Sequence, residues 1–202
     1  MFPLGTVLMP GGVLPLHVFE PRYRQLVQDC LAADDPEFGV VMIERGSEVG
    51  GADQRTLAGC VARIVELGEL PDGRYVMVTV GTRRIRVNAW LPDDPYPIAD
   101  VDDWPDDDGF DSGLGDAVAA LAPRVRRAAA LAVELGVAEA GLADDVPDDP
   151  LLASFHLARL APVGPLDQYR LLRTAGAGER LRLLADLLDE VEPSLRFRLE
   201  QG

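Results

Sequence analysis

The side chains that most often carry catalysis or bind metals are scarce in this sequence. It contains two histidines, His17 and His156, and two cysteines, Cys30 and Cys60. None of the spacings typical of zinc sites or of Cys-X-X-Cys redox motifs occurs among them. His17 falls in an apolar run and His156 and Cys30 in amphipathic helical patterns, which favours packing roles. We therefore predict no catalytic residue, no metal site and no cofactor.

The most concentrated polar cluster is Glu20, Pro21, Arg22 and Tyr23, where an extended run changes to helical spacing. Two interpretations are open. In the first, Pro21 begins a helix, Glu20 caps backbone N–H groups and Arg22 pairs with a carboxylate or carbonyl. In the second, Arg22, Tyr23 and Arg24 line a peptide-binding surface, because Tyr and Arg concentrate binding energy at interfaces. Cap chemistry favours the first, and the exposure of the side chains decides between them.

A second group of arginines lies in an alternating segment, residues 83–90. Ile85 and Val87 fall on one face of the predicted strand, and Arg84 and Arg86 fall on the other. The positive face is a second candidate surface, for an acidic peptide or nucleic acid. Its alternative role is to balance the aspartates that follow in the chain. We favour that role, because the neighbouring strands are not basic.

Negative charge is concentrated in two segments of a chain whose formal net charge is −15. Residues 93–116 contain ten Asp and no Arg, and Asp144, Asp145, Asp148 and Asp149 follow later. Repulsion between like charges favours an extended, solvated chain, so both segments are predicted to be linkers. The sequence contains no Lys, so all of its positive side-chain charge at neutral pH is on Arg.

The first half of the chain has the pattern of short strands. Apolar and β-branched runs of strand length recur as far as residue 90, with one helical segment after Pro21. The clearest turn is Pro71-Asp72-Gly73, where Pro presets φ and Gly accepts a positive φ. Residues 60–67 and 75–80 should therefore form a β-hairpin. Strands at this spacing predict a small barrel or a strongly coiled sheet.

The second half of the chain has helical spacing. A helical pattern begins at Leu114, and Pro123 within it must kink the helix or begin a second one. Asp149-Pro150 is a start signal for the next helix, since Asp caps and Pro fits the first turn. Residues 166–172 and 181–191 predict two more. This half should therefore form a helical bundle.

Targeting signals are also scarce. No apolar run approaches the ~20 residues needed to cross a bilayer, and the hydrophobic start lacks the basic region and cleavage site of a signal peptide. Two cysteines are too few for a disulfide framework. We expect a cytoplasmic protein that does not enter a membrane.

Five segments of the first half are also informative by their order. They read FPLG at residues 2–5, LPLHVFEPRY at 14–23, FGVV at 38–41, residues 59–64 with LPDGRY at 70–75, and GTRRI at 81–85. Together they resemble the amino-terminal domain family of Lon-type ATP-dependent proteases, in its single-domain bacterial form. Residues 168–172 and 179–181 resemble the helical end of that domain more weakly.

The resemblance implies an α+β fold, in which a PUA-like β pseudo-barrel with one early helix precedes a carboxyl-terminal helical bundle. We expect the barrel and the acidic linker in residues 1–110 and the bundle in residues 111–202. In Lon itself the domain captures substrate proteins, while the ATPase and the Ser-Lys protease lie elsewhere. Without Lys, these 202 residues contain neither a GxxxxGK[ST] phosphate loop nor a Ser-Lys dyad.

The leading hypothesis is thus a non-catalytic module that binds unfolded or tagged protein segments, in protein quality control and beside a separate protease. The alternative is an RNA-binding module, because PUA-like barrels also recognise structured RNA. Nucleic acid is not expected as the partner, since a near-neutral barrel beside an acidic segment lacks the Lys and Arg footprint of phosphate binding.

Overall fold

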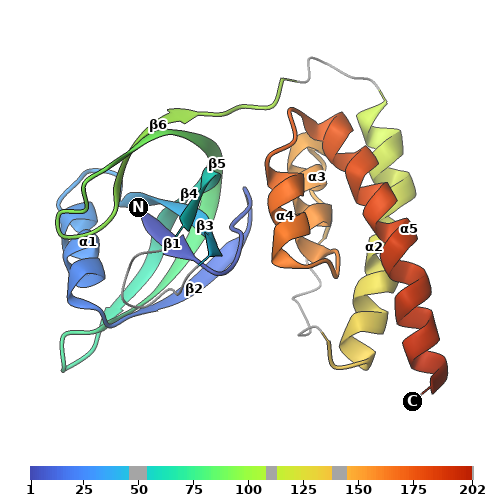
Figure 1. Cartoon of the computed structure of the whole chain (residues 1–202), viewed down its shortest axis with the longest axis horizontal. Helices are drawn as coiled ribbons and strands as arrows, with labels where there is room; N and C mark the ends of the chain where they lie inside the picture. Colours follow the sequence, from blue (N-terminus) through green and yellow to red (C-terminus); the bar gives the residue numbers. More distant parts are fainter. Residues whose placement is uncertain (46–53, 108–112, 138–144, 202) are drawn as a thin grey trace. The chain divides into compact units, whose positions relative to one another are not determined.

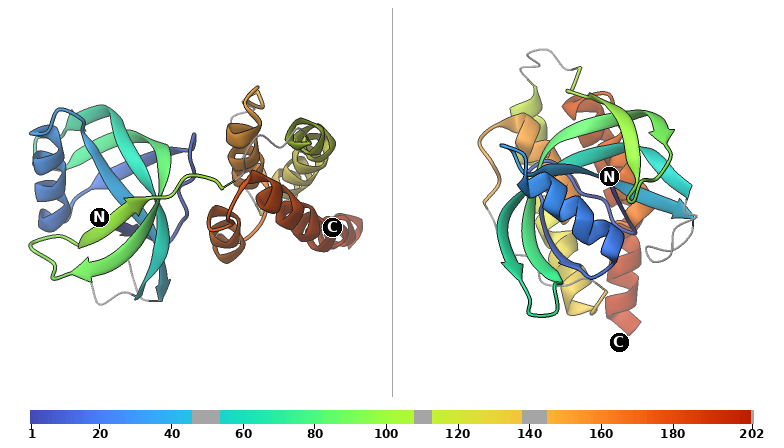
Figure 2. Two further views of the ribbon diagram at one scale, coloured as in Figure 1. Left: turned by 90° about the horizontal axis from the view of Figure 1, so that it is seen from above. Right: turned by 90° about the vertical axis from the view of Figure 1, so that its left-hand side faces the viewer.

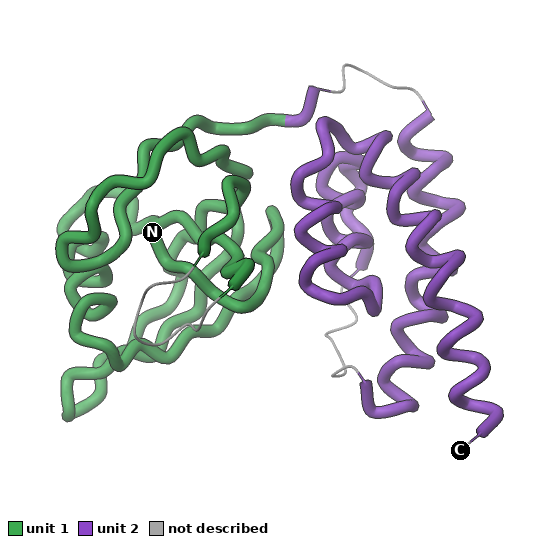
Figure 3. Tube along the Cα trace, in the orientation of Figure 1, with its two compact units in different colours: residues 1–105 green, residues 106–202 purple. Residues whose placement is uncertain are grey.

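Strands occupy the first half of the chain and helices the second (Figure 1). The computed structural model describes residues 1–45, 54–107, 113–137 and 145–201. The chain divides into unit 1, Met1–Pro105, and unit 2, Asp106–Gly202 (Figure 3). The α+β fold predicted from the sequence is confirmed. The predicted boundary between residues 110 and 111 lies outside the described residues.

Unit 1 contains one mixed sheet of six strands. The strand order is β1-β3-β4-β5-β2, and β6 also pairs with β5. β1 runs parallel to β3, and the other pairs are antiparallel. The strands are β1 (Phe2–Leu4), β2 (Val13–Val18), β3 (Glu37–Arg45), β4 (Gln54–Glu69), β5 (Tyr75–Leu91) and β6 (Ile98–Asp103).

The long strand β5 holds this sheet together. Residues 75–80 of β5 pair with β2, residues 85–91 pair with β6, and β4 pairs along most of the same length. Register shifts between Cys60 and Ala62 and between Ile64 and Glu66 mark irregularities in the pairing of β4 with β5, and irregularities of this kind increase strand bending and twist. The sheet therefore curves strongly (Figure 2), in agreement with the predicted coiled sheet.

Helix α1 (Pro21–Leu31) contributes to the core of unit 1. It begins with Pro21 in the first turn, where the missing N–H costs no hydrogen bond. Tyr23, Leu26 and Val27 are buried on one face of the helix. Tyr23 stacks on Phe2 of β1 with ring centroids 4.1 Å apart. The first strand and the first helix are therefore joined through aromatic packing.

The acidic segment after residue 92 is not the solvated linker that the sequence predicted. Its residues 98–103 form β6 and pair with β5, and Asp93 accepts two hydrogen bonds from Arg55 at 2.9 and 3.1 Å. The prediction was wrong for this part because it considered only repulsion between aspartates. Strand pairing and arginines from other strands compensate for that repulsion. Asp144 and Asp111 lie outside the described residues.

An ion-pair network crosses the same sheet. Arg83 of β5 donates to both carboxylate oxygens of Glu37 on β3, at 2.6 and 3.0 Å, and to Asp103 of β6 at 2.8 Å. Arg63 of β4 also reaches Glu37, at 3.5 Å. Hydrogen bonds from Arg83 hold the pKa of Glu37 below its usual value. The network thus connects four strands through charge-assisted hydrogen bonds.

Unit 2 is helical. Its helices are α2 (Leu114–Glu134), α3 (Pro150–Leu160), α4 (Pro165–Leu172) and α5 (Ala177–Gln201). Asp149 caps α3 as predicted, since its carboxylate accepts a hydrogen bond from the N–H of Leu151 at 2.9 Å. Pro123 lies inside a continuous α2, so the helix is not divided in two. Within the described ranges, no helix has the length and apolar content to span a bilayer.

A buried ion pair lies in the core of unit 2. The Arg180 side chain of α5 is fully buried and donates to both oxygens of Asp106, at 2.8 and 3.0 Å. It also donates to the Ser154 hydroxyl at 2.6 Å and to the Leu171 carbonyl at 3.2 Å, and it lies over the Phe155 ring. Asp106 therefore belongs to the core of unit 2, although the sequence placed it in the linker.

We expect Arg180→Met to destabilise unit 2 by about 3–5 kcal/mol, because it leaves the Asp106 carboxylate buried without its countercharge. Urea unfolding followed by far-UV circular dichroism measures the change. Arg182→Met is the matched control, since Arg182 is exposed on the same helix, and should change stability by less than about 0.5 kcal/mol. The milder Asp106→Asn tests the same pair if Arg180→Met does not fold. If Arg180→Met and Asp106→Asn both unfold at the same urea concentration as the wild type, the Arg180–Asp106 pair does not stabilise unit 2.

The network around Glu37 should make unit 1 sensitive to acid. Because the folded-state pKa of Glu37 is depressed, its contribution is fully present above the ordinary pKa of 4.5 and is lost as pH falls through the folded-state pKa. Glu37→Gln should therefore flatten the acid limb of the stability profile of unit 1. Thermal unfolding between pH 3 and 7, followed by tryptophan fluorescence, measures this. An unchanged acid limb would show that the Glu37 network contributes nothing measurable.

Candidate functional site

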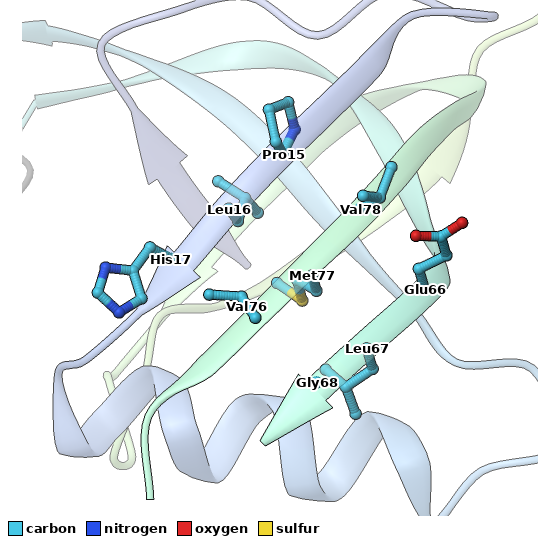
Figure 4. Close-up of a pocket in the computed structure, with 9 residues that line it drawn as sticks. All are labelled: Pro15, Leu16, His17, Glu66, Leu67, Gly68, Val76, Met77 and Val78. Atoms are coloured by element: carbon cyan, nitrogen blue, oxygen red, sulfur yellow. The ribbon is translucent and has the colours of Figure 1, made fainter. Parts of the chain in front are cut away.

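An open groove of about 550 Å³ lies on the outer side of the sheet of unit 1 (Figure 4). Three neighbouring strands form it, with β5 between β2 and β4. Its lining is mostly apolar. The residues are Pro15, Leu16 and His17 of β2, Glu66, Leu67 and Gly68 of β4, and Val76, Met77 and Val78 of β5.

Strand register places the outward side chains of the groove in two rows. Val76 pairs with His17 on one side and with Gly68 on the other. Val78 pairs in the same way with Pro15 and Glu66. Alternate residues of a strand point to opposite faces, so Met77 is buried while Val76 is 43% exposed. The groove is thus the solvent side of strands whose other side forms the core.

Gly68 gives the groove its depth on the β4 side. A Cβ atom at this position would lie 3.3 Å from Cγ2 of Val76, which is closer than an ordinary van der Waals contact. The absence of a side chain leaves Val76 accessible between β2 and β4. Beyond the groove, Val13 of β2 is 57% exposed and Val65 of β4 is 53% exposed. The apolar surface therefore continues past the two rows.

The outer edge of β2 is less suited to binding than its face. The Gly81 N–H donates to the Gly12 carbonyl at 2.8 Å. Antiparallel alternation then turns the backbone groups of Leu14 and Leu16 toward β5 and those of Pro15 away from it. Pro15 has no N–H to offer at that edge, a common protection of edge strands. A ligand would consequently contact the side chains of the groove.

The predicted cluster at the start of α1 has an architectural arrangement. Glu20 makes no side-chain cap, so the predicted capping role was wrong. Its carboxylate instead accepts a hydrogen bond from Arg22 Nε at 3.0 Å, because the extended Glu20 lies beside the first helical turn. Arg22 also lies over the ring of the buried Tyr23, at 4.5 Å. Arg24 packs its guanidinium against Gly73 in the β4–β5 turn.

The predicted hairpin turn holds its expected conformation. Gly73 has a φ of 76°, and Asp72 accepts hydrogen bonds from the backbone N–H of Arg74 at 3.2 Å and from its Nε at 2.6 Å. These bonds lower the pKa of Asp72. Asp72 and Gly73 thus form the turn that joins β4 to β5, as a structural motif.

The second predicted arginine surface surrounds a tryptophan. Arg84 is 3% exposed, lies 4.7 Å from the Trp104 ring centroid and donates to the Pro105 carbonyl at 3.3 Å. Arg86 is exposed and lies 4.2 Å from the same ring. Arg84 and Arg86 therefore hold the end of unit 1 in place through Trp104. Burial leaves Arg84 little surface for a ligand.

None of the five predicted binding residues (Arg22, Tyr23, Arg24, Arg84 and Arg86) lines the groove. Sequence reasoning missed the groove because it read residues 13–19 only as an apolar run containing His17 and did not ask which face of that strand is exposed. Pro15 within that run is a signal of an edge strand with one accessible face, and it could have identified the site.

The described residues also offer little chemistry. No group of three or more His, Cys, Asp and Glu side chains among them is arranged to hold a metal ion. Burial raises the pKa of the Cys60 thiol to about 12, and it also raises the pKa of Cys30. Both thiols stay protonated at neutral pH, which disfavours them as nucleophiles.

Comparison with known proteins gives the family. The model of the ATP-dependent protease La (LON) substrate-binding domain matches residues 1–190. The chain belongs to this family. Its resemblance to the Lon amino-terminal domain, read from the sequence, is confirmed.

Individual relatives agree with the family. The chain is 31% identical over 196 residues to Lon protease 2 of Myxococcus xanthus, covering 95% of this chain and 23% of that protein. It therefore spans about a quarter of the length of the curated Lon proteases that it matches.

Solved structures of this family share the fold. A Lon N-terminal domain protein from Xanthomonas campestris matches with a TM-score of 0.64 at 27% identity, covering 92% of this chain and 95% of that one. The N-terminal domain of the Mycobacterium avium complex Lon protease matches with a TM-score of 0.58 at 20% identity, covering 93% and 96%.

Proposed function

We propose that this chain is a non-catalytic substrate-recognition module that binds exposed apolar segments of other proteins in the groove of β2, β4 and β5. The observation that carries the proposal is the accessible apolar surface around Val76, on strands whose opposite face includes the buried Val18, Tyr75 and Met77. Membership of a family described as a substrate-binding domain supports the same assignment.

Chain segments of unfolded or tagged proteins fit this groove chemically. They expose apolar side chains that folded proteins bury, and each buried CH₂ group contributes about 0.8 kcal/mol to binding. We infer a role in protein quality control, beside a protease that carries the hydrolytic chemistry. The cytoplasmic location stays a prediction from the sequence.

RNA is the weaker candidate for a ligand. Glu66 is the single charged side chain among the nine described residues that line the groove, and it repels phosphate. The arginine pair around Trp104 already packs on an aromatic ring of its own chain. These observations support a protein partner.

Val76→Ser should weaken binding of an unfolded protein about tenfold, because it removes apolar contact area worth about 1.4 kcal/mol. Fluorescence anisotropy with a reduced, carboxymethylated reporter protein measures the affinity, and the native form of that reporter serves as the folded comparison. The matched control is Val101→Ser on β6, which is also exposed but lies outside the groove. Equal affinities for wild type and Val76→Ser would sink the proposal, as would equal binding of the native reporter.

The purified chain should hydrolyse neither ATP nor casein, because its sequence contains no GxxxxGK[ST] phosphate loop and no Ser-Lys dyad, and its two cysteines stay protonated. Phosphate release and peptide release, measured before and after a second purification step, test this. Turnover that co-purifies with the chain at constant specific activity would overturn the non-enzymatic assignment.

A further inference from the structure

One charged side chain stands out in the groove. Glu66 extends from β4 beside Val78, in the row that ends at Pro15 (Figure 4). Its side chain is exposed, and within the described part of the chain it makes no hydrogen bond or ion pair. A carboxylate without a countercharge among the described residues therefore lies on the mostly apolar surface of the groove.

The arginines nearest to Glu66 in the sequence already have partners. Arg63 of β4 reaches Glu37 at 3.5 Å and Asp35 at 4.0 Å, on another part of the sheet. Arg74 is bound to Asp72 in the turn, at 2.6 Å. The nine lining residues include no Arg. The chain thus leaves the countercharge of Glu66 to be supplied from outside.

A ligand that covers the groove must reduce the hydration of this carboxylate. Removing water from a charge is costly unless an opposite charge replaces the water. A ligand with a cationic side chain near Glu66 compensates for that cost, whereas an anionic one adds repulsion. A single charge so placed discriminates between ligands more than it raises affinity in general.

We infer that the groove selects apolar segments that carry a Lys or Arg beside the apolar residues, and that Glu66 is the specificity-determining residue. This inference rests on the proposed function, since it names the class of segment bound at the same site. The rows of Val76 and Val78 are two strand residues apart, or about 6.6 Å. In a ligand lying along the strands, the cation should therefore be about two residues from the apolar anchor.

The experiment uses three synthetic peptides with one shared apolar core and a Lys, Ser or Glu two residues away. Fluorescence anisotropy gives their affinities for wild type, Glu66→Gln, Glu66→Lys and Glu44→Gln. Glu44 is the matched control, an exposed glutamate on β3 outside the groove. Circular dichroism confirms that each variant is folded.

We expect wild type to bind the Lys peptide about fivefold more tightly than the Ser peptide, a difference typical of an ion pair at the protein surface. The Glu peptide should bind least tightly. Glu66→Gln should abolish the order, Glu66→Lys should invert it, and Glu44→Gln should leave it unchanged. Salt should reduce the preference for Lys without removing the binding of the Ser peptide.

Other outcomes overturn the inference in distinguishable ways. If the Ser peptide binds through Val76 and the Lys peptide binds no better, the selectivity of Glu66 is refuted while the proposed function stands. The same order in wild type and Glu66→Gln would assign the preference to the overall negative charge of the chain. No binding of any peptide would refute both proposals. Concentration-dependent self-association that Val76→Ser abolishes would make the occupant a second copy of the chain.

Discussion

Backbone pairing of β5 with three other strands is the constraint on which unit 1 depends. β5 pairs with β4 along most of its length, and it uses its first part for β2 and its second part for β6. Because side chains alternate along a strand, a slip of one residue would turn Met77 outward and Val76 into the core. The register that buries the core is therefore the register that forms the groove.

The β4–β5 turn helps to fix this register. Gly73 adopts its positive φ at low cost, and the Leu70 N–H donates to the Arg74 carbonyl at 2.8 Å. Arg24 packs on Gly73 from α1 and links the helix to the turn. The polar residues that first suggest binding are thus part of the framework that holds the groove in shape.

Arginine balances the many aspartates of this chain in two different settings. On the sheet of unit 1, exposed pairs such as Arg83 with Asp103 contribute little individually but connect neighbouring strands. In unit 2, the Arg180–Asp106 pair is almost fully buried, so each partner is needed to compensate for the buried charge of the other. In both cases an arginine pairs with an aspartate of the acidic segment 93–116, so that part of this segment belongs to the folded structure. A count of charges along the sequence does not reveal these pairs.

The sequence by itself determined the family, the α+β class, the hairpin at Asp72-Gly73 and the capped start of α3, because these follow from local periodicity, turn chemistry and ordered motifs. The absence of Lys also showed that these residues contain neither the phosphate loop of an ATPase nor the Ser-Lys dyad of the Lon protease. Only the tertiary structure decided which polar residues are framework and which strand face is free. The burial of Arg84, the pairing of Asp106 with Arg180 and the isolation of Glu66 depend on contacts between residues distant in sequence. The physical reason is that a side chain's charge is set by its own chemistry, whereas its exposure and its partner are set by strand register and packing.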